Sequence, residues 1–241
     1  MRIALVHGSW HDGSLWGPVA DHLKAAGHEV HTPTIAGHGK GVVKKGVDHA
    51  QCTRSIVDYL VERDLRDVVL IGHSFGGTVI AKVAEAVPER LRRMVFWNAF
   101  VPQDGESLND NTPPHYRELF DSLAAATDDF TVMLPFPIWR EAFINDADLA
   151  TAQRTYELLS PEPYQPFLDK LDMKKFYALQ TPRSYLNCTE DIALPPGPWG
   201  WHPRMHSRLG LCRLHQIPGS HETMFSAPER LAMAMIEAGR D

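Results

Sequence analysis

The stretch Val69–Leu91, VLIGHSFGGTVIAKVAEAVPERL, predicts both the fold and the chemistry of this chain. It begins with aliphatic residues typical of a strand buried on both faces, and it continues after Ser74 as a helix that ends near Pro88. Between the two lies the segment 72–76, GHSFG, which matches the pattern G-x-S-x-G. A strand, a sharp turn and a helix around this pattern indicate a nucleophile elbow, in which the serine hydroxyl stands at the carboxyl end of a sheet. The alternative is a glycine-rich turn with an inert serine.

The sequence on both sides of this stretch alternates between strand and helix patterns. The helix patterns place apolar residues three and four positions apart, as Ile56 and Leu60 illustrate. This order of elements predicts a mainly parallel, doubly wound α/β sheet with helices on both faces and right-handed crossovers. The expected strands span residues 3–7, 29–35, 67–73 and 93–99, and the expected helices span residues 13–28, 52–65 and 75–87.

The alternation stops in the middle of the chain, where prolines and aromatic residues become frequent. We expect this part to form a helical cap over the sheet. Strand patterns return over residues 183–191 and 211–219, and a helix pattern over residues 227–239 closes the sequence. The expected organisation is a core of residues 1–104 and 181–241, with a cap of residues 105–180 inserted before the last two strands.

A serine hydroxyl becomes a strong nucleophile when a neighbouring base takes its proton, and histidine is a common base. Of the 13 histidines, His221 has the best position, because it follows the last expected strand at the carboxyl end of the sheet. In wound α/β enzymes with such an elbow, serine, acid and histidine follow one another along the chain. Asp191, after the preceding strand, is therefore the preferred acid, and it would hold the imidazole in one tautomer. Asp104, which also follows a strand, is the alternative acid.

Negative charge that develops on a substrate carbonyl oxygen requires hydrogen-bond donors, and backbone N–H groups supply them in many hydrolases. One donor is expected from Phe75, the residue after the nucleophile. The other is expected from Ser9, in the loop after the first strand, where Gly8 gives the backbone room to turn. The alternative for this loop, HGSW, is a plain turn at a strand end.

The cap carries a cluster of apolar residues, which predicts a pocket for an apolar or aromatic substrate. Gly8 and Trp10, from the first loop, are expected to complete this pocket. The alternative is that the cap residues form the cap's own small core, since pockets and cores share this composition. The cap residues concerned are Phe130, Met133, Leu134, Phe136, Ile138 and Trp139, of which Met133, Phe136 and Trp139 are the preferred substrate contacts.

Composition argues against several classes of function. The net charge is −6 with histidine counted neutral, so the chain is a poor candidate for binding nucleic acid. No apolar run approaches the roughly 20 residues that a membrane span requires. Three cysteines without CxxC spacing fit a reducing compartment, and a cytoplasmic location is expected. The oligomeric state stays open, with a homodimer among the alternatives.

His202 and His206 have the spacing of a metal-binding pair on a helix. The sequence offers them no evident third ligand, which a zinc site requires. We therefore expect neither a metal nor a cofactor.

The sequence resembles the α/β-hydrolase superfamily and, within it, the branch that holds the salicylate-binding plant methylesterases and the hydroxynitrile lyases. The stretches that carry the resemblance are LVHGSWHDGSLW, LKAAGHEV, LIGHSFGG, SYLNCTED and IPGSHETMFSAPERL, which span nearly the whole chain except the cap. The resemblance implies an α/β-hydrolase fold with Ser74, Asp191 and His221 as the triad. It also implies that Ser9 and Phe75 form the oxyanion hole.

Two positions distinguish the esterases from the lyases of this branch. The lyases carry a threonine in place of Gly8 and a lysine in place of Glu222, and the lysine handles the charge of cyanide, which an acidic residue would repel. Both differences favour hydrolysis. Glu222 also departs from the apolar residue common in the esterases, and Ser220 replaces the aspartate that often precedes their histidine, so the identity of the substrate stays open.

The sequence thus predicts a cofactor-independent serine hydrolase that cleaves a carboxylic ester of a small molecule through an acyl-enzyme. One alternative is C–C cleavage, cyanohydrin lysis or cofactor-free oxygenation at the same site. Another is a non-catalytic receptor for a small molecule on the same scaffold.

Overall fold

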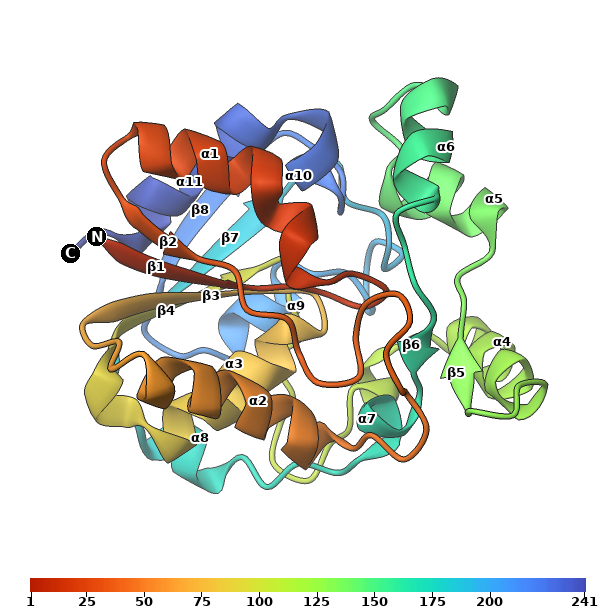
Figure 1. Cartoon of the computed structure of the whole chain (residues 1–241), viewed down its shortest axis with the longest axis horizontal. Coiled ribbons are helices and arrows are strands. Elements are labelled where there is room, and N and C mark those ends of the chain that lie inside the picture. Colours follow the sequence, from red (N-terminus) through yellow and green to blue (C-terminus); the bar gives the residue numbers. More distant parts are fainter.

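The computed structural model describes residues 1–241, and its centre is one sheet of six strands (Figure 1). The strands span Arg2–Val6 (β1), Glu29–His31 (β2), Val68–His73 (β3), Leu91–Trp97 (β4), Arg183–Cys188 (β7) and Arg213–Ile217 (β8). Their order is β2-β1-β3-β4-β7-β8, and every neighbouring pair is parallel. The predicted parallel, doubly wound sheet is confirmed.

Alternate residues of the inner strands face opposite sides of the sheet and pack into two separate cores. On β1, Ile3 and Leu5 belong to one hydrophobic cluster, whereas Ala4 and Val6 belong to the other. All four side chains are fully buried. Burial on both faces explains why the strand patterns of the sequence lack alternating polar residues.

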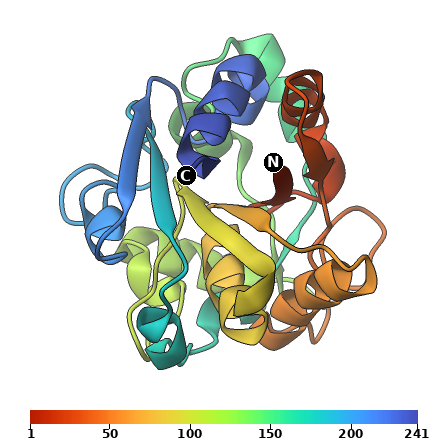
Figure 2. The ribbon, with the colours of Figure 1, turned by 90° about the vertical axis from the view of Figure 1, so that its left-hand side faces the viewer.

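Helices cover both faces of the sheet. On one face α1 (Gly17–Ala25) packs against α11 (Pro228–Gly239), and on the other α2 (His49–Glu62) packs against α3 (Gly76–Ala86). Figures 1 and 2 show these two layers with the sheet between them. The first turn of α2 is fixed by a capping box, in which Asp48 and Gln51 exchange hydrogen bonds between side chain and backbone.

The second strand is shorter than its sequence pattern predicts. The expected strand covers residues 29–35, but the ladder with β1 includes only Glu29, Val30 and His31. Pro33 lacks a backbone N–H and so cannot extend the ladder. Beyond it the chain turns toward the carboxyl end of the sheet.

The cap segment lies mainly beyond the carboxyl ends of the strands, on the right of Figure 1. Its β5 and β6 form an antiparallel pair, which the sequence patterns did not predict. Its last helix, α8, packs against α3 of the core, so the division at residue 180 remains a prediction. The cap elements are α4 (Pro114–Ala125), β5 (Thr131–Val132), α5 (Phe136–Ile138), a π-helical turn (Trp139–Phe143), α6 (Leu149–Tyr156), β6 (Glu162–Pro163), α7 (Gln165–Leu168) and α8 (Lys174–Ala178).

Short helical turns complete the connections. None of the helices combines the length and the apolar character that crossing a membrane would require. The short elements are α9 (Arg204–Ser207), α10 (Thr223–Ser226) and the 3-10 turns Gly13–Trp16, Pro88–Arg90 and Asn109–Asn111.

Candidate active site

Ser74 occupies a sharp turn between β3 and α3. Its φ of 52° lies in the left-handed region, which a residue with a side chain seldom adopts. The turn is crowded, because a Cβ on Gly72 would lie 2.7 Å from the carbonyl oxygen of Gly76 and a Cβ on Gly76 would lie 2.6 Å from that of His7. The Ser74 carbonyl accepts hydrogen bonds from the backbone of Gly77 and of Phe100. The elbow is therefore held in a strained conformation by its surroundings.

His221 and Asp191 meet at the ends of β8 and β7. The Nδ1 of His221 lies 2.6 Å from Oδ2 of Asp191, and both side chains are buried. A carboxylate can only accept, so Nδ1 donates and Nε2 is left as the basic nitrogen. The imidazole is stacked on Trp201 with ring centroids 5.1 Å apart. Contacts on two sides thus fix both the tautomer and the orientation of the ring.

Asn98 is a polar residue at this site that the sequence analysis did not single out. Its amide donates to Oδ2 of Asp191 at 2.5 Å, and its oxygen accepts the backbone N–H of Cys188 at 2.7 Å. The backbone N–H of Ala193 donates to the other carboxylate oxygen at 2.9 Å. Asn98 follows β4 directly and is fully buried. Its signal in the sequence is a polar residue at the end of a buried strand, the same signal that marks Asp191.

The alternative acid, Asp104, lies elsewhere. Its carboxylate accepts the backbone N–H of Met173 at 2.9 Å, and its side chain is 41% exposed. The structure therefore brings Asp191, and not Asp104, to the imidazole of His221.

Ser74 and His221 line the same cavity, together with Ser9. The Ser74 hydroxyl makes no hydrogen bond in this structure, and such contacts between nucleophile and base are often loose without substrate. The backbone N–H groups of Ser9 and Phe75 donate to no protein acceptor, although both residues are buried. Buried N–H groups are nearly always paired. Two free donors on either side of the serine are an arrangement suited to an oxyanion.

Gly8 allows the first loop to approach the elbow. A Cβ at this position would lie 2.9 Å from both Nδ1 of His73 and Cβ of Ser74. With the present backbone, a side chain at this position would be too close to both residues. Gly8 itself does not line the cavity, so its place in the structure is that of a spacer and not of a substrate contact.

The cavity is narrow and mostly apolar, with a volume of ≈ 30 Å³. Burial raises the pKa of Tyr116 to about 12, so its phenol stays protonated at neutral pH. A wider groove of ≈ 630 Å³ lies beside His49, but no serine lines it. Besides Ser9, Ser74 and His221, the cavity is lined by Trp10, Phe100, Leu108, Thr112, Tyr116, Phe120, Phe143, Phe167, Ala193, Leu194 and Trp201.

Of the predicted substrate contacts, only Trp10 lies on the cavity wall. Trp139 is fully buried in the cap, where its indole N–H donates to the carbonyl of Ala152 at 3.1 Å. Met133 and Phe136 are partly buried and pack against the main core cluster. The structure thus places these three cap residues in the packing of the cap, and the wall comes from α4, α7 and the π-helical turn instead.

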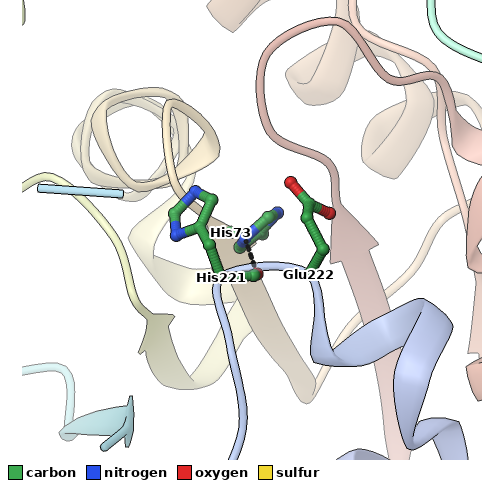
Figure 3. Close-up of side chains that lie close together, drawn as sticks. All are labelled: His73, His221 and Glu222. Atoms are coloured by element: carbon green, nitrogen blue, oxygen red, sulfur yellow. Dashed lines mark hydrogen bonds between the residues drawn. The ribbon is translucent and has the colours of Figure 1, made fainter. Parts of the chain in front are cut away.

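His73 lies beside the imidazole of His221, with Glu222 on its other side (Figure 3). In Figure 3 the side chains of His221 and Glu222, neighbours in the chain, diverge on either side of His73, whose Nε2 donates to the His221 carbonyl at 3.0 Å. Burial lowers the pKa of His73 well below its usual value, and the nearby His221 lowers it further. Glu222 lies 3.2 Å from Nε2 of His11, and both side chains are buried. Burial alone would lower the pKa of His11, but the Glu222 carboxylate raises it.

The same three side chains bring potential metal ligands together. One ligand atom each of His73, His221 and Glu222 lies within 4.8 Å of the other two. The fit to a cation is poor, because Nε2 of His11 already lies 3.2 Å from the Glu222 carboxylate, which raises the pKa of His11. The expectation that the protein needs no metal and no cofactor stays a prediction.

The fold and the site define a class: a parallel α/β protein with a serine elbow at the carboxyl edge of its sheet and a histidine–aspartate pair beside it. Comparison with known proteins agrees, because the chain matches the alpha/beta hydrolase family over residues 3–234. The chain belongs to that family, and the predicted fold class is confirmed.

Three relatives define its neighbourhood. A solved extracellular α/β-hydrolase from a Paenibacillus species, described as sharing structural and functional homology with tobacco salicylic acid-binding protein 2, is 45% identical over 100% of both chains with a TM-score of 0.97. A carbendazim hydrolyzing esterase from a Nocardioides strain is 41% identical over 44% of this chain and 45% of its own length. Salicylic acid-binding protein 2 of Nicotiana tabacum is 26% identical over 98% of this chain and 96% of its own. The predicted resemblance to the salicylate-binding branch is confirmed.

The Paenibacillus relative is extracellular by its description. The cytoplasmic location of the present chain therefore stays a prediction, as does the homodimer.

Proposed function

We propose that this protein is a serine hydrolase that cleaves a carboxylic ester of a small apolar or aromatic molecule. The observation that carries the proposal is the contact between His221 and Asp191 beside the cavity that Ser74 lines. Relatives described as an esterase and as a pyrethroid hydrolase support ester cleavage.

In the first half of the reaction, Oγ of Ser74 attacks the ester carbonyl carbon while Nε2 of His221 takes the hydroxyl proton. The resulting oxyanion accepts hydrogen bonds from the free N–H groups of Ser9 and Phe75. The C–O bond to the alcohol then breaks, and His221 returns its proton to the departing oxygen. The products of this half are the free alcohol and an acyl group on Ser74.

In the second half, His221 takes a proton from water, and the hydroxide attacks the acyl carbon. Collapse of the second tetrahedral intermediate releases the carboxylic acid and gives the proton back to Ser74. Asp191 accepts from Nδ1 throughout and stabilises the imidazolium that forms in each half. Asn98 and Ala193, which bond to the carboxylate oxygens of Asp191, hold it in position for this task.

The cavity favours a slim substrate. Aromatic side chains supply most of its wall, and the space between them is small. Tyr116 offers a phenol that makes no hydrogen bond within the protein and stays protonated. A flat acyl group with one hydrogen-bond acceptor would satisfy this wall.

The lyase alternative finds less support at the same site. Glu222 stands where the lyases carry a lysine, and it is buried beside His11, so this position supplies no lysine ammonium to handle a leaving cyanide. The receptor alternative leaves the two free backbone donors without a purpose.

The test is the hydrolysis of p-nitrophenyl esters by the wild-type protein and by Ser74→Ala. We expect the substitution to lower kcat by a factor on the order of 10⁶, since the three side chains act as a unit. A fluorophosphonate probe should label the wild type and not the variant, and Ser207→Ala, on the exposed face of α9, serves as the matched control.

Largely retained turnover in Ser74→Ala would remove Ser74 from the mechanism and favour the lyase alternative. Tight binding of a small molecule without labelling of the wild type would favour the receptor.

A further inference from the structure

The loop that carries Ser9 is held by the cap through the next residue, Trp10. The backbone of Trp10 has a φ of 64°, an unusual conformation for a residue with a large side chain. Its carbonyl accepts the backbone N–H of Ser160 at 2.9 Å, and its indole N–H donates to the carbonyl of Val132 at 2.9 Å. Its own backbone N–H donates to the carboxylate of Glu162 at 2.8 Å. All the polar groups of Trp10 thus bond to the cap.

Glu162 is fully buried, and both of its oxygens are engaged. Oε2 accepts from Trp10, whereas Oε1 lies 2.9 Å from Nε2 of His38. A buried carboxylate is tolerated only when such partners compensate for its lost hydration. Glu162 comes from β6 of the cap and His38 from the loop after β2, so this pair joins two distant segments at the first loop.

His38 also contacts the second proposed oxyanion donor. Its ring is stacked on the ring of Phe75, with centroids 5.7 Å apart and planes 15° from parallel. Its Nδ1 lies 2.9 Å from the carbonyl oxygen of Ala36, which fixes the ring within its own loop. The Glu162–His38 pair therefore touches the backbone next to Ser9 at one end and the side chain of Phe75 at the other.

We propose that Glu162 and His38 are positioning residues for the oxyanion hole, through which the cap sets the separation of the Ser9 and Phe75 N–H groups. This inference rests on the proposed ester hydrolysis. Hydrogen bonds to an oxyanion act only when the donors are already aimed at the position that its charge will occupy. A strained residue directly after Ser9 keeps its conformation only while its surroundings hold it. Loss of the carboxylate lets the Trp10 backbone relax and carries the Ser9 N–H away from the oxyanion.

The principal test compares Glu162→Ala with the wild type in steady-state ester hydrolysis. We expect kcat to fall about 10- to 100-fold, since complete loss of one oxyanion donor costs about 10²–10³, whereas KM changes less than about threefold. The affinity for a trifluoromethyl ketone, which forms a tetrahedral adduct with an active serine, should weaken by the same factor as kcat/KM. If Glu162 contributed only to stability, the folded variant would keep the wild-type kcat/KM and the wild-type affinity for the ketone.

Glu162→Gln is the conservative variant. A glutamine oxygen accepts from Trp10, and its amide donates to Nε2 of His38 while Nδ1 donates to Ala36, so both hydrogen bonds form without the carboxylate charge. We expect this variant to keep at least about a third of wild-type kcat. If Glu162→Ala does not fold, His38→Gln replaces it, with the same expected split between kcat and KM.

Glu85→Ala is the matched control. Glu85 is also a buried carboxylate that accepts a backbone N–H from a distant segment, that of Phe176 at 3.0 Å, but it lies near the C-terminal end of α3, at the opposite end of that helix from the elbow. We expect it to lower the melting temperature and to leave kcat unchanged.

Two outcomes would overturn the inference: wild-type kcat in Glu162→Ala, or equal losses of kcat in Glu162→Ala and Glu85→Ala. Absence of ester hydrolysis in the wild type would instead contradict the proposed function, so the two failures are distinguishable.

Discussion

The edge of the sheet and the cap above it build the two sides of the cavity in different ways. At the sheet edge, each side chain of the proposed triad follows a strand: Ser74 follows β3, Asp191 follows β7 and His221 follows β8. The ladder hydrogen bonds of the sheet therefore fix where these side chains lie. In the cap, Tyr116 and Phe167 reach the cavity from α4 and α7, which lie outside the sheet and are held by side-chain packing and by scattered hydrogen bonds such as that from Tyr164 to Asp121.

This difference separates two tasks. Groups on the sheet edge need accurate placement, because a proton transfer depends on distances of a few tenths of an ångström. Aromatic residues on the cap need only supply an apolar wall, which many packings can do. We therefore infer that substitutions at the edge change the rate of reaction, whereas substitutions among the apolar residues of the cap change stability and the choice of substrate. Glu162, which bonds to the loop that carries Ser9, is the exception in the cap.

The largest effect on the cap side is expected for Trp139→Ala. Its indole is fully buried and bonds to Ala152, so the substitution leaves a cavity that should lower the free energy of unfolding by about 3–5 kcal/mol. Urea denaturation measures this change. Trp199→Ala, at a partly exposed position over Arg204, is the control and should lose much less. If the variant instead kept its stability and had a raised KM, Trp139 would be a substrate contact, as the sequence predicted.

The contact between the cap and the core should depend on pH through His49. Its Nε2 bonds to Thr78 at 2.8 Å, and its backbone N–H donates to Asp169 of the cap segment. Burial lowers the pKa of His49 to about 4, so between about pH 6.5 and 4 the unfolded chain binds a proton that the folded protein does not. The free energy of unfolding should therefore decrease as the pH is lowered through this window. The loss should approach about 3 kcal/mol near pH 4.

Urea unfolding of the wild type and of His49→Gln at several pH values isolates this contribution. His7 and His73, whose pKa values burial also lowers, affect both proteins equally. The difference in the free energy of unfolding between the wild type and His49→Gln should become smaller as the pH is lowered. Parallel curves would show that His49 does not titrate in this way.

A smaller effect on the rate is expected for Asn98→Ala at the sheet edge, together with some loss of stability, because the substitution also removes the acceptor of the buried Cys188 N–H. A hydrogen bond to a charged group contributes about 1.5–3 kcal/mol, so losing the amide beside Asp191 should lower kcat/KM about 10- to 100-fold. Steady-state ester hydrolysis measures it, with Asn145→Ala as a control, since Asn145 bonds only to the backbone of Glu190. A wild-type kcat/KM in Asn98→Ala would mean that Ala193 and His221 are sufficient to hold the carboxylate.

Much of the sheet edge was predictable because strand patterns and chain order constrain it together. The elbow at Ser74 and the pair formed by Asp191 and His221 each follow a recognisable strand, and parallel strands end at one edge. Asn98 obeys the same rule, but an asparagine after a strand is also a common turn residue, so the pattern alone did not distinguish it.

The cap was far less predictable. An apolar residue in a short helix can face a cavity or a core, and its sequence neighbours do not say which. Trp139 and Tyr116 illustrate the two outcomes: both are aromatic cap residues, but one packs inside the cap and the other lines the cavity. The antiparallel pair of β5 and β6 escaped prediction because each strand has only two residues.

The three bonds from Trp10 to the cap have a consequence for anyone who would give this scaffold a new specificity. Replacing the cap with that of a related enzyme would also replace the groups that bond to Trp10, in the loop beside Ser74. A replacement cap chosen only for the shape of its pocket would leave the proposed oxyanion donor of Ser9 misaligned. A replacement cap that keeps a carboxylate at the position of Glu162, with His38 retained in the core, would change the substrate preference while ester hydrolysis continues.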